Sequence, residues 1–171
     1  MTFSALATPA ATVIFTFTMV YAGLNDLTTM RIRNGLVLGL LAAYAILAPL
    51  AGFADGEMAW SVAIAAGILV VCFVFFAFGW MGGGDVKLLA VTALWLGPDH
   101  TPAFLVYTAL FGGALTLAVL RLRLVGLPEF LGNRPWIARL QSDRSGVPYG
   151  VAVTLAALVV FPQTRWMSIV F

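Results

Sequence analysis

Charged residues are scarce in this 171-residue chain. Asp, Glu, Lys and Arg together make up 9% of the sequence, against roughly 25% in a typical soluble domain. In contrast, 62% of the residues are hydrophobic and the mean hydropathy is +1.03. Water is therefore not the main solvent of the chain. The sequence also lacks a long polar stretch or a Ser/Pro-rich linker, so we expect one transmembrane domain covering residues 1–171.

Cysteine and histidine are almost absent. Cys72 lies within an apolar run, and His100 follows Asp99 in a short connection. One residue of each type cannot form a disulfide framework or a Cys/His zinc cluster, and the sequence has no HExxH motif. We therefore expect neither a metal nor another cofactor. A serine protease would need His100 near a serine, but the topology described below separates it from Ser142 and Ser145.

Six apolar runs are separated by short polar connections. Several are shorter than the ~20 residues of a full membrane crossing, so residues that flank them must enter the interfacial zone or the bilayer must thin. We expect an all-α membrane protein, a bundle of about six transmembrane helices. The runs cover residues 9–25, 35–51, 59–78, 86–97, 102–120 and 147–162.

The basic residues predict the orientation of this bundle. The net charge of +2 and the pI near 9.0 do not indicate nucleic-acid binding, because the basic residues lie mostly between apolar runs. Alternate connections carry them, and the remaining connections carry acids such as Glu57 and Asp99 instead. The positive-inside rule then places the basic connections in the cytoplasm and both termini outside, with Arg165 as the one exception. The basic residues are Arg31 and Arg33, Lys87, and Arg121, Arg123, Arg134, Arg139 and Arg144 in a cytoplasmic loop of about 121–147.

Two aspartates stand where an apolar run meets a cytoplasmic connection. Asp26 closes the first run in GLNDLTTMRIRN, and Asp85 follows three glycines in WMGGGDVKLLAV. A carboxylate at membrane depth is costly and usually faces a bundle interior or a wet cavity, where it has a functional role. The alternative for Asp26 is an ordinary interfacial acid that ends a helix.

Glycine residues frame Asp85. Successive glycines from 82 to 84 permit positive φ and remove side chains, so that a substrate backbone could approach the carboxylate. A flexible turn that Asp85 caps is the alternative. Lys87 could tune the charge of Asp85 or hold its loop at the headgroups, although a snorkelling, positive-inside lysine is the simpler interpretation.

Together the two aspartates suggest an aspartic peptidase. Two carboxylates that share one proton can hold a water molecule, and either one can act as the acid or the base. A small membrane transporter or ion-coupled channel subunit is the alternative, in which Asp26 and Asp85 would carry protons or bind a cation. That alternative predicts two interrupted helices, whereas only one Gly-rich break is evident.

The same motifs resemble those of a known family. Asp26 in DLTTMRIRN, Asp85 in GGGDVK and the VPYG segment at 147–150 are similar to motifs of type IV prepilin peptidases, the GxGD-type membrane aspartic proteases. The resemblance implies that Asp26 and Asp85 are catalytic. It also implies cleavage of the leader peptide of a pilin-like precursor at the cytoplasmic face of a bacterial inner membrane. Residues implied to bind substrate or support the loops are Gly82, Gly83, Gly84, Lys87 and Asn34.

The chain departs from the family pattern in two places. The family commonly has proline where this chain has Arg33, between Ile32 and Asn34. Long members carry a cytoplasmic segment with paired CxxC motifs and also methylate the new pilin terminus, whereas this chain has one cysteine. It therefore resembles the short, CpaA/TadV-like form, which implies a peptidase for Flp/Tad-like pilins without N-methyltransferase activity.

Two further features carry weaker expectations. Pro135 and the WIARL segment after it predict a short amphipathic helix on the lipid surface, although a plain basic connection is the simpler interpretation. Tryptophans near the ends of the runs are expected to be interfacial anchors. They are Trp60, Trp80, Trp95 and Trp166.

Overall fold

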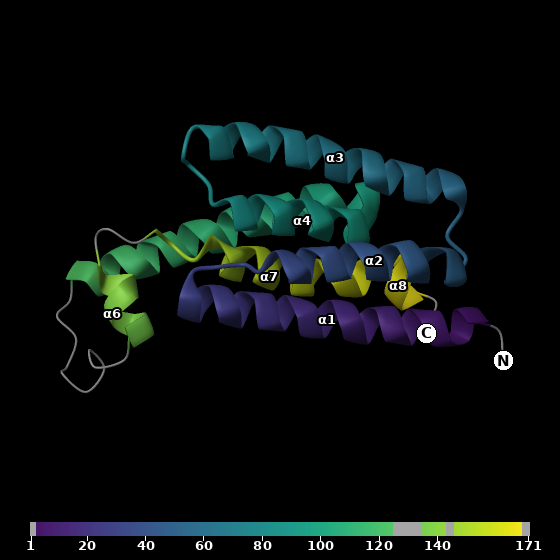
Figure 1. Ribbon diagram of the computed structural model, residues 1–171, viewed down its shortest axis with the longest axis horizontal. Coiled ribbons are helices and arrows are strands. Elements are labelled where there is room, and N and C mark those ends of the chain that lie inside the picture. The colour runs from purple at the N-terminus through teal and green to yellow at the C-terminus, as the bar shows by residue number, and fades with distance from the viewer. Residues whose placement is uncertain (1–2, 125–134, 143–145, 169–171) are drawn as a thin grey trace.

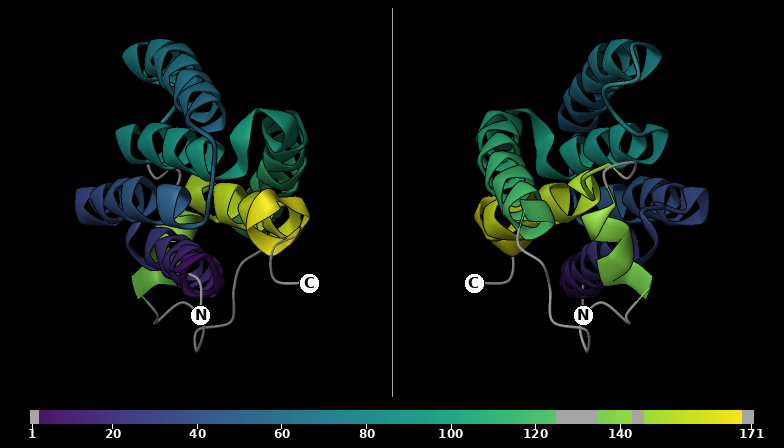
Figure 2. Two further views of the ribbon diagram at one scale, coloured as in Figure 1. Left: turned by 90° about the vertical axis from the view of Figure 1, so that its right-hand side faces the viewer. Right: turned by 90° about the vertical axis from the view of Figure 1, so that its left-hand side faces the viewer.

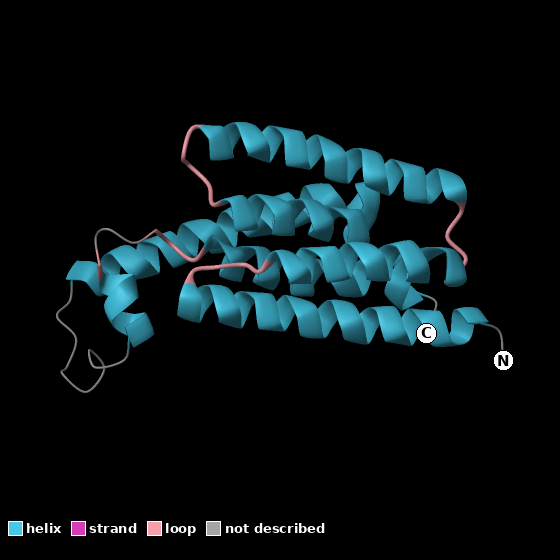
Figure 3. Cartoon of the chain, viewed as in Figure 1, coloured by secondary structure: helices cyan, strands magenta, loops and turns pink. Residues whose placement is uncertain are grey.

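The fold is a bundle of helices, shown in Figure 1 and coloured by secondary structure in Figure 3. The computed structural model describes residues 3–124, 135–142 and 146–168, and all regular structure in these segments is helical. The helices are α1 (Phe3–Thr29), α2 (Asn34–Leu50), α3 (Asp55–Ala77), α4 (Gly83–Leu124), α6 (Pro135–Gln141), α7 (Tyr149–Val160), the short 3-10 helix η1 (Phe161–Gln163) and α8 (Arg165–Ser168).

The expected count of six membrane spans is not confirmed. Seven α-helices lie in the described segments, and three helical stretches are long and apolar enough to cross a membrane, judged by length and composition: Leu6–Thr29, Asp55–Ala77 and Gly83–Leu124. Two apolar helices, Asn34–Leu50 and Tyr149–Gln163, are shorter. The count differs because the fourth and fifth apolar runs belong to one interrupted helix, α4, and because the second and sixth runs form short helices.

A single residue divides α4 into two arms. Gly97 has φ 74° and ψ 176°, which is not helical, and Pro98 follows it. The chain reverses there, so residues 98–124 run back beside residues 83–96 (Figures 1 and 2). The hydroxyl of Thr101 donates a 2.6 Å hydrogen bond to the Gly97 carbonyl and so closes the turn. Glycine is needed at this position because its backbone conformation is almost inaccessible to other residues.

The basic connections gather at one end of the bundle. The α1–α2 connection, both outer ends of α4, helix α6 and the start of α7 lie at that end, whereas the start of α1, the α2–α3 connection, the Gly97 turn and α8 lie at the other (Figure 1). The alternation of charge along the sequence therefore corresponds to a separation of charge between the two ends.

Arg165, the one basic residue at the acidic end, is paired there. Its guanidinium forms an ion pair with Glu57, donates a 2.9 Å hydrogen bond to the Gly52 carbonyl and lies 4.7 Å from the centre of the Phe53 ring. Both charged side chains are partly exposed, so the pair contributes little stability by charge alone. It does connect α8 to the start of α3.

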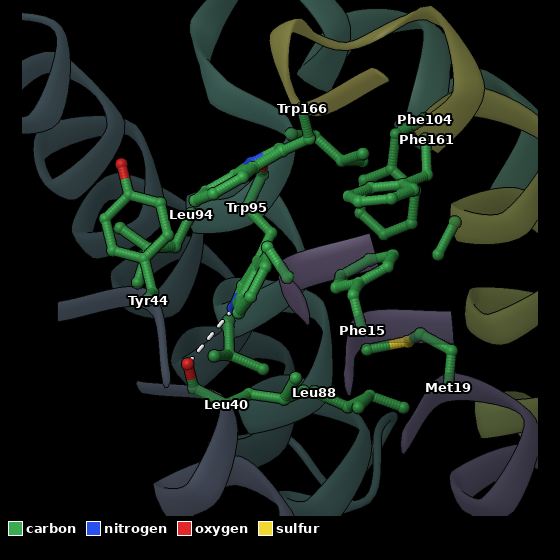
Figure 4. Packing of buried hydrophobic residues seen from close by; sticks show 14 of the residues in the cluster. Phe15, Met19, Leu40, Tyr44, Leu88, Leu94, Trp95, Phe104, Phe161 and Trp166 are labelled. Carbon is green, nitrogen blue, oxygen red and sulfur yellow. Dashed lines mark hydrogen bonds between the residues drawn. The ribbon is translucent and has the colours of Figure 1, made fainter. Parts of the chain in front are cut away.

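Aromatic side chains fill the core between these ends (Figure 4). Trp95 and Trp166 are 1% and 0% exposed, so their expected role as interfacial anchors is wrong. Their indole N–H groups donate to the carbonyls of Leu40 and Trp95, at 3.1 and 2.9 Å, which satisfies both donors inside the core. Trp60 and Trp80 are 66% and 75% exposed, as an interfacial anchor requires.

We expect Gly97→Ala to destabilise the bundle. The substitution places a Cβ on a backbone conformation that only glycine adopts readily, at a cost of about 1–3 kcal/mol. Thermal unfolding of the detergent-purified protein measures this effect. Gly113→Ala is the matched control, because Gly113 lies in the helical second arm with open space around it and alanine favours a helix by about 1 kcal/mol. Equal melting temperatures for the two variants would contradict the expectation.

Candidate functional site

Asp26 lies inside the bundle. Ala11, Phe15, Met19 and Ala22 form the buried stripe of α1, and Asp26 continues that stripe at helical spacing with 4% of its surface exposed. Its Oδ2 atom is fully buried and has no hydrogen bond of good geometry within the described residues. An interfacial acid that merely ends a helix would instead face water.

Asp85 lies in the first turn of α4, after a turn that leaves no room for side chains. A Cβ on Gly82 would lie 2.9 Å from Asp85 Oδ2, one on Gly83 would lie 3.2 Å from the Phe76 ring, and one on Gly84 would lie 3.0 Å from Cβ of Ile32. None of the three glycines has a positive φ, so the expectation of unusual backbone angles is wrong here. Close packing is what requires glycine at these positions.

The first turn of α7 brings the two aspartates together. The backbone amides of Gly150 and Val151 approach the carboxylate of Asp26, and the amides of Gly82 and Gly150 approach that of Asp85. The two carboxylates also interact electrostatically with each other. Gly150 therefore stands beside both, at a helix N-terminus, where the helix dipole favours negative charge.

Gly150 cannot carry a side chain in this arrangement. A Cβ there would lie 2.8 Å from Asp26 Oδ2 and 2.8 Å from Cδ1 of Ile32. The sequence offered a signal for this residue, the VPYG segment, but that segment indicated only the start of the last helix. The role of Gly150 follows from the fold, because Asp85, Ile32 and Asp26 lie at least 65 positions away along the chain.

The α1–α2 connection folds back over the site. Met30 directly follows α1 with φ 53° and donates a 2.7 Å hydrogen bond from its backbone N–H to the Asp26 carbonyl. The Asn25 side-chain amide donates to the Arg31 carbonyl at 2.6 Å, which holds the reversed chain against α1. Ile32 is thereby placed between Gly84 and Gly150. The α1–α2 connection, the start of α4 and the start of α7 therefore meet at one side chain.

Asn34 and Lys87 join α2 to α4 at the same end. Lys87 Nζ donates a 3.0 Å hydrogen bond to Asn34 Oδ1, which connects the first residue of α2 to the first turns of α4. Both side chains are exposed. In residues 3–124, 135–142 and 146–168, no group of three His, Cys, Asp or Glu side chains is placed to hold a metal ion.

Helix α6 confirms the amphipathic helix expected after Pro135, but it packs on protein. Ile137 and Leu140 are buried, Arg139 donates a 3.2 Å hydrogen bond to the Thr28 carbonyl at the end of α1, and Arg123 donates a 3.0 Å bond to the Leu140 carbonyl. The rest of the expected 121–147 loop, at 125–134 and 143–145, lies outside the described residues.

Arg33 has the backbone conformation of a proline, with φ −71° and ψ 132°. Proline fixes φ near −65°, so we expect Arg33→Pro to leave the fold intact. The substitution reduces the conformational freedom of the unfolded chain, so we expect it to stabilise the protein by about 0.4–1 kcal/mol and to raise the melting temperature. The test compares the melting temperature of Arg33→Pro with that of Arg31→Pro, a control in the same connection. A large destabilisation by Arg33→Pro would show that the connection has a different conformation.

Comparison with known proteins gives one match. The sequence model of the type IV leader peptidase family matches residues 13–117. No curated protein and no solved structure matches the chain. The matched segment holds both aspartates, the glycines before Asp85, Asn34 and Lys87, and it ends before Gly150. Because it covers more than half of the chain and the long helices are apolar enough to span a bilayer, this membrane protein belongs to the type IV leader peptidase family.

Proposed function

We propose that the chain is a membrane aspartic endopeptidase that removes the leader peptide from type IV pilin precursors, with Asp26 and Asp85 as the catalytic pair. One observation carries the proposal. The fold of a leader peptidase family member places these two carboxylates beside one backbone amide, that of Gly150, although they come from different helices. Two structural acids would have no reason to lie beside each other, because neighbouring carboxylates repel when both are ionised.

The pair can catalyse hydrolysis of a peptide bond without a covalent intermediate. Two neighbouring carboxylates repel each other when both are ionised, and one shared proton removes the repulsion. The ionised member takes a proton from a water molecule as its oxygen adds to the scissile carbonyl, and the protonated member donates to that carbonyl oxygen. Transfer of a proton to the amide nitrogen then accompanies cleavage of the C–N bond and leaves a free acid and a free amine.

The Gly150 amide supports this chemistry by positioning. Its N–H stands beside both carboxylates, where it stabilises negative charge on either one without supplying a side chain that could compete for substrate. Either carboxylate can hold the shared proton. An N–H donor beside both therefore stabilises whichever carboxylate is ionised.

The location proposed is the cytoplasmic side of the bacterial inner membrane. Both aspartates lie at the bundle end that carries the arginine-bearing connections (Figure 1), which the positive-inside rule assigns to the cytoplasm. The two arms of α4 count as two crossings in this arrangement, giving six in all, with both termini outside.

The class of precursor proposed is the Flp/Tad-like pilins, cleaved without methylation. This rests on the resemblance to short members of the family and on the lack of paired CxxC motifs in the sequence. Cys72, the one cysteine, is buried in α3.

We expect Asp26→Asn and Asp85→Asn each to abolish cleavage of a co-expressed Flp-like pilin precursor. Each substitution removes one carboxylate while keeping the size of the side chain, so a loss of at least a hundredfold at matched membrane levels reports on chemistry. Asp99→Asn, at the other end of the bundle, is the control. Cleavage retained by either variant would exclude the pair, and a wild-type chain that cleaves no precursor would favour the transporter alternative.

Gly150→Ala tests the third component of the site. The new methyl group would overlap the Asp26 carboxylate and Ile32, so we expect kcat to fall at least tenfold, because a displacement of about 1 Å at a catalytic group has effects of this size. Gly35→Ala, at a position with open space around it, should leave the rate unchanged. The prediction is wrong if Gly150→Ala cleaves the precursor at the wild-type rate.

A further inference from the structure

A second buried polar group lies about one helical turn from Asp26. Thr154 in α7 is 5% exposed, and its Oγ1 atom, like Oδ2 of Asp26, has no hydrogen bond of good geometry within the described residues. Burying a hydroxyl or a carboxylate without a partner is unfavourable, so native proteins rarely leave such groups unsatisfied. A possible donor and a possible acceptor are therefore both buried at this place in the fold.

Helices α1 and α7 bring Thr154 to the same interface as Asp26. A Cβ on Gly150 would lie 2.8 Å from Oδ2 of Asp26, and one on Gly23 would lie 3.1 Å from Oγ1 of Thr154. Gly23 precedes Asp26 by three residues on α1, and Thr154 follows Gly150 by four on α7. Residues at these spacings share one face of a helix. Thr154 therefore lies beneath Asp26, roughly 5 Å further from the end of the bundle that carries the aspartates.

The two side chains lean toward each other. Helices α1 and α7 run in opposite directions (Figure 1), and the side chains of a helix tilt toward its N-terminus. Asp26 consequently tilts toward the level of Thr154, whereas Thr154 tilts toward the start of α7 and the level of Asp26. Two O–H···O hydrogen bonds in series span about 5.5 Å, so one water molecule is sufficient to join the hydroxyl to the carboxylate.

The hydroxyl of Thr154 is not used by its own helix. A threonine within a helix can donate to the carbonyl four residues before it, and five threonines of the described helices do so: Thr12, Thr28, Thr29, Thr101 and Thr116. Thr154 forms no such bond with Gly150. Its Oγ1 atom instead faces α1 at Gly23. Asp26 is the one carboxylate in the sequence of α1, so it is the charged acceptor on the helix that this donor faces.

We propose that Thr154 is a positioning residue for the hydrolytic reaction: its hydroxyl is joined through one buried water molecule to Oδ2 of Asp26 and so fixes the orientation of that carboxylate. The inference rests on the proposed peptidase function and adds a side chain to a site otherwise held by backbone. The terminal torsion of an aspartate is only loosely restricted. The Gly150 amide approaches the carboxylate at the start of α7, and a second contact from the level of Thr154 limits its rotation.

Thermal unfolding of the detergent-purified protein tests the connection without any substrate. Thr108 supplies the matched control, because it is 4% exposed on the second arm of α4 and its hydroxyl likewise has no hydrogen bond of good geometry in the described residues. Loss of an unpartnered buried hydroxyl is neutral or stabilising, so we expect Thr108→Val to melt at or above the wild-type temperature. Thr154→Val keeps the shape of the side chain but removes the contact to Asp26, so we expect it to melt below the wild type.

A double-mutant cycle with Asp26→Ala assigns this effect to the carboxylate. Without the carboxylate, the Thr154 hydroxyl has nothing to position. We therefore expect Thr154→Val to lower the melting temperature in the Asp26→Ala background by less than about half of the decrease that it causes in the wild type. A melting temperature of Thr154→Val at or above that of the wild type, or an equal decrease in both backgrounds, would overturn the proposal.

Cleavage kinetics distinguish positioning from a purely structural role. We expect Thr154→Val to lower kcat for the pilin precursor roughly tenfold with KM unchanged, because a misoriented catalytic group affects the chemical step. Thr154→Ser keeps the hydroxyl and should retain kcat to within about twofold, and Thr108→Val should cleave at the wild-type rate. An equal loss in Thr154→Ser and Thr154→Val, or a wild-type kcat in Thr154→Val, would overturn the inference.

Failure of the underlying peptidase proposal has a different signature. A wild-type chain that cleaves no precursor would overturn that proposal, and with it the catalytic meaning of the contact. The melting temperatures would still report whether Thr154 and Asp26 are connected, because they require no substrate.

Discussion

The approach of the α7 N-terminus to the buried carboxylate of Asp26 is the constraint on which the rest of the site depends. A carboxylate at this depth is unfavourable unless something compensates its charge, and Oδ2 of Asp26 has no hydrogen bond of good geometry in the described residues. The compensation comes from backbone: the amides of Gly150 and Val151 at the start of α7. Because backbone must come so close, position 150 has no room for a side chain.

The same constraint explains the other small residues near the site. Ile32 contacts both Gly84 and Gly150, so the α1–α2 connection, the start of α4 and the start of α7 share one apolar contact. A larger residue at either glycine would move one aspartate relative to the other. The aromatic core around Trp95 and Trp166 lies towards the opposite end of the bundle, whereas the N-termini of α2, α4 and α7 lie at the Asp26 end.

Composition and apolar runs were sufficient to predict an all-helical membrane protein. The cost of charge at membrane depth selected Asp26 and Asp85 as candidates, and the fold brings both beside Gly150. Their catalytic role stays a prediction. A reversal between the fourth and fifth apolar runs was expected, because they were predicted as separate crossings. That a single residue, Gly97, makes this reversal within one interrupted helix was not predicted. Trp95 and Trp166 were misplaced because hydropathy does not distinguish a tryptophan at the lipid interface from one whose N–H finds a carbonyl in the core.

Gly150 shows why part of a site cannot be found from local pattern. Its importance comes from neighbours that are distant in sequence, and nothing within VPYG specifies them. The glycines before Asp85 give the converse case: the pattern suggested positive φ, whereas the three glycines have none and lie where a Cβ would approach its neighbours closely. A run of glycines can indicate either a positive φ or a lack of space for side chains, and only the packing distinguishes the two.

The loose attachment of α3 contrasts with this tight site. The packing of Ile32 against two glycines leaves little space for the segments around the aspartates to shift. Helix α3 packs on α4, is held at its start by the Arg165–Glu57 pair and buries few of its residues. The fold is thus tightly packed around the aspartates and most loosely packed along α3.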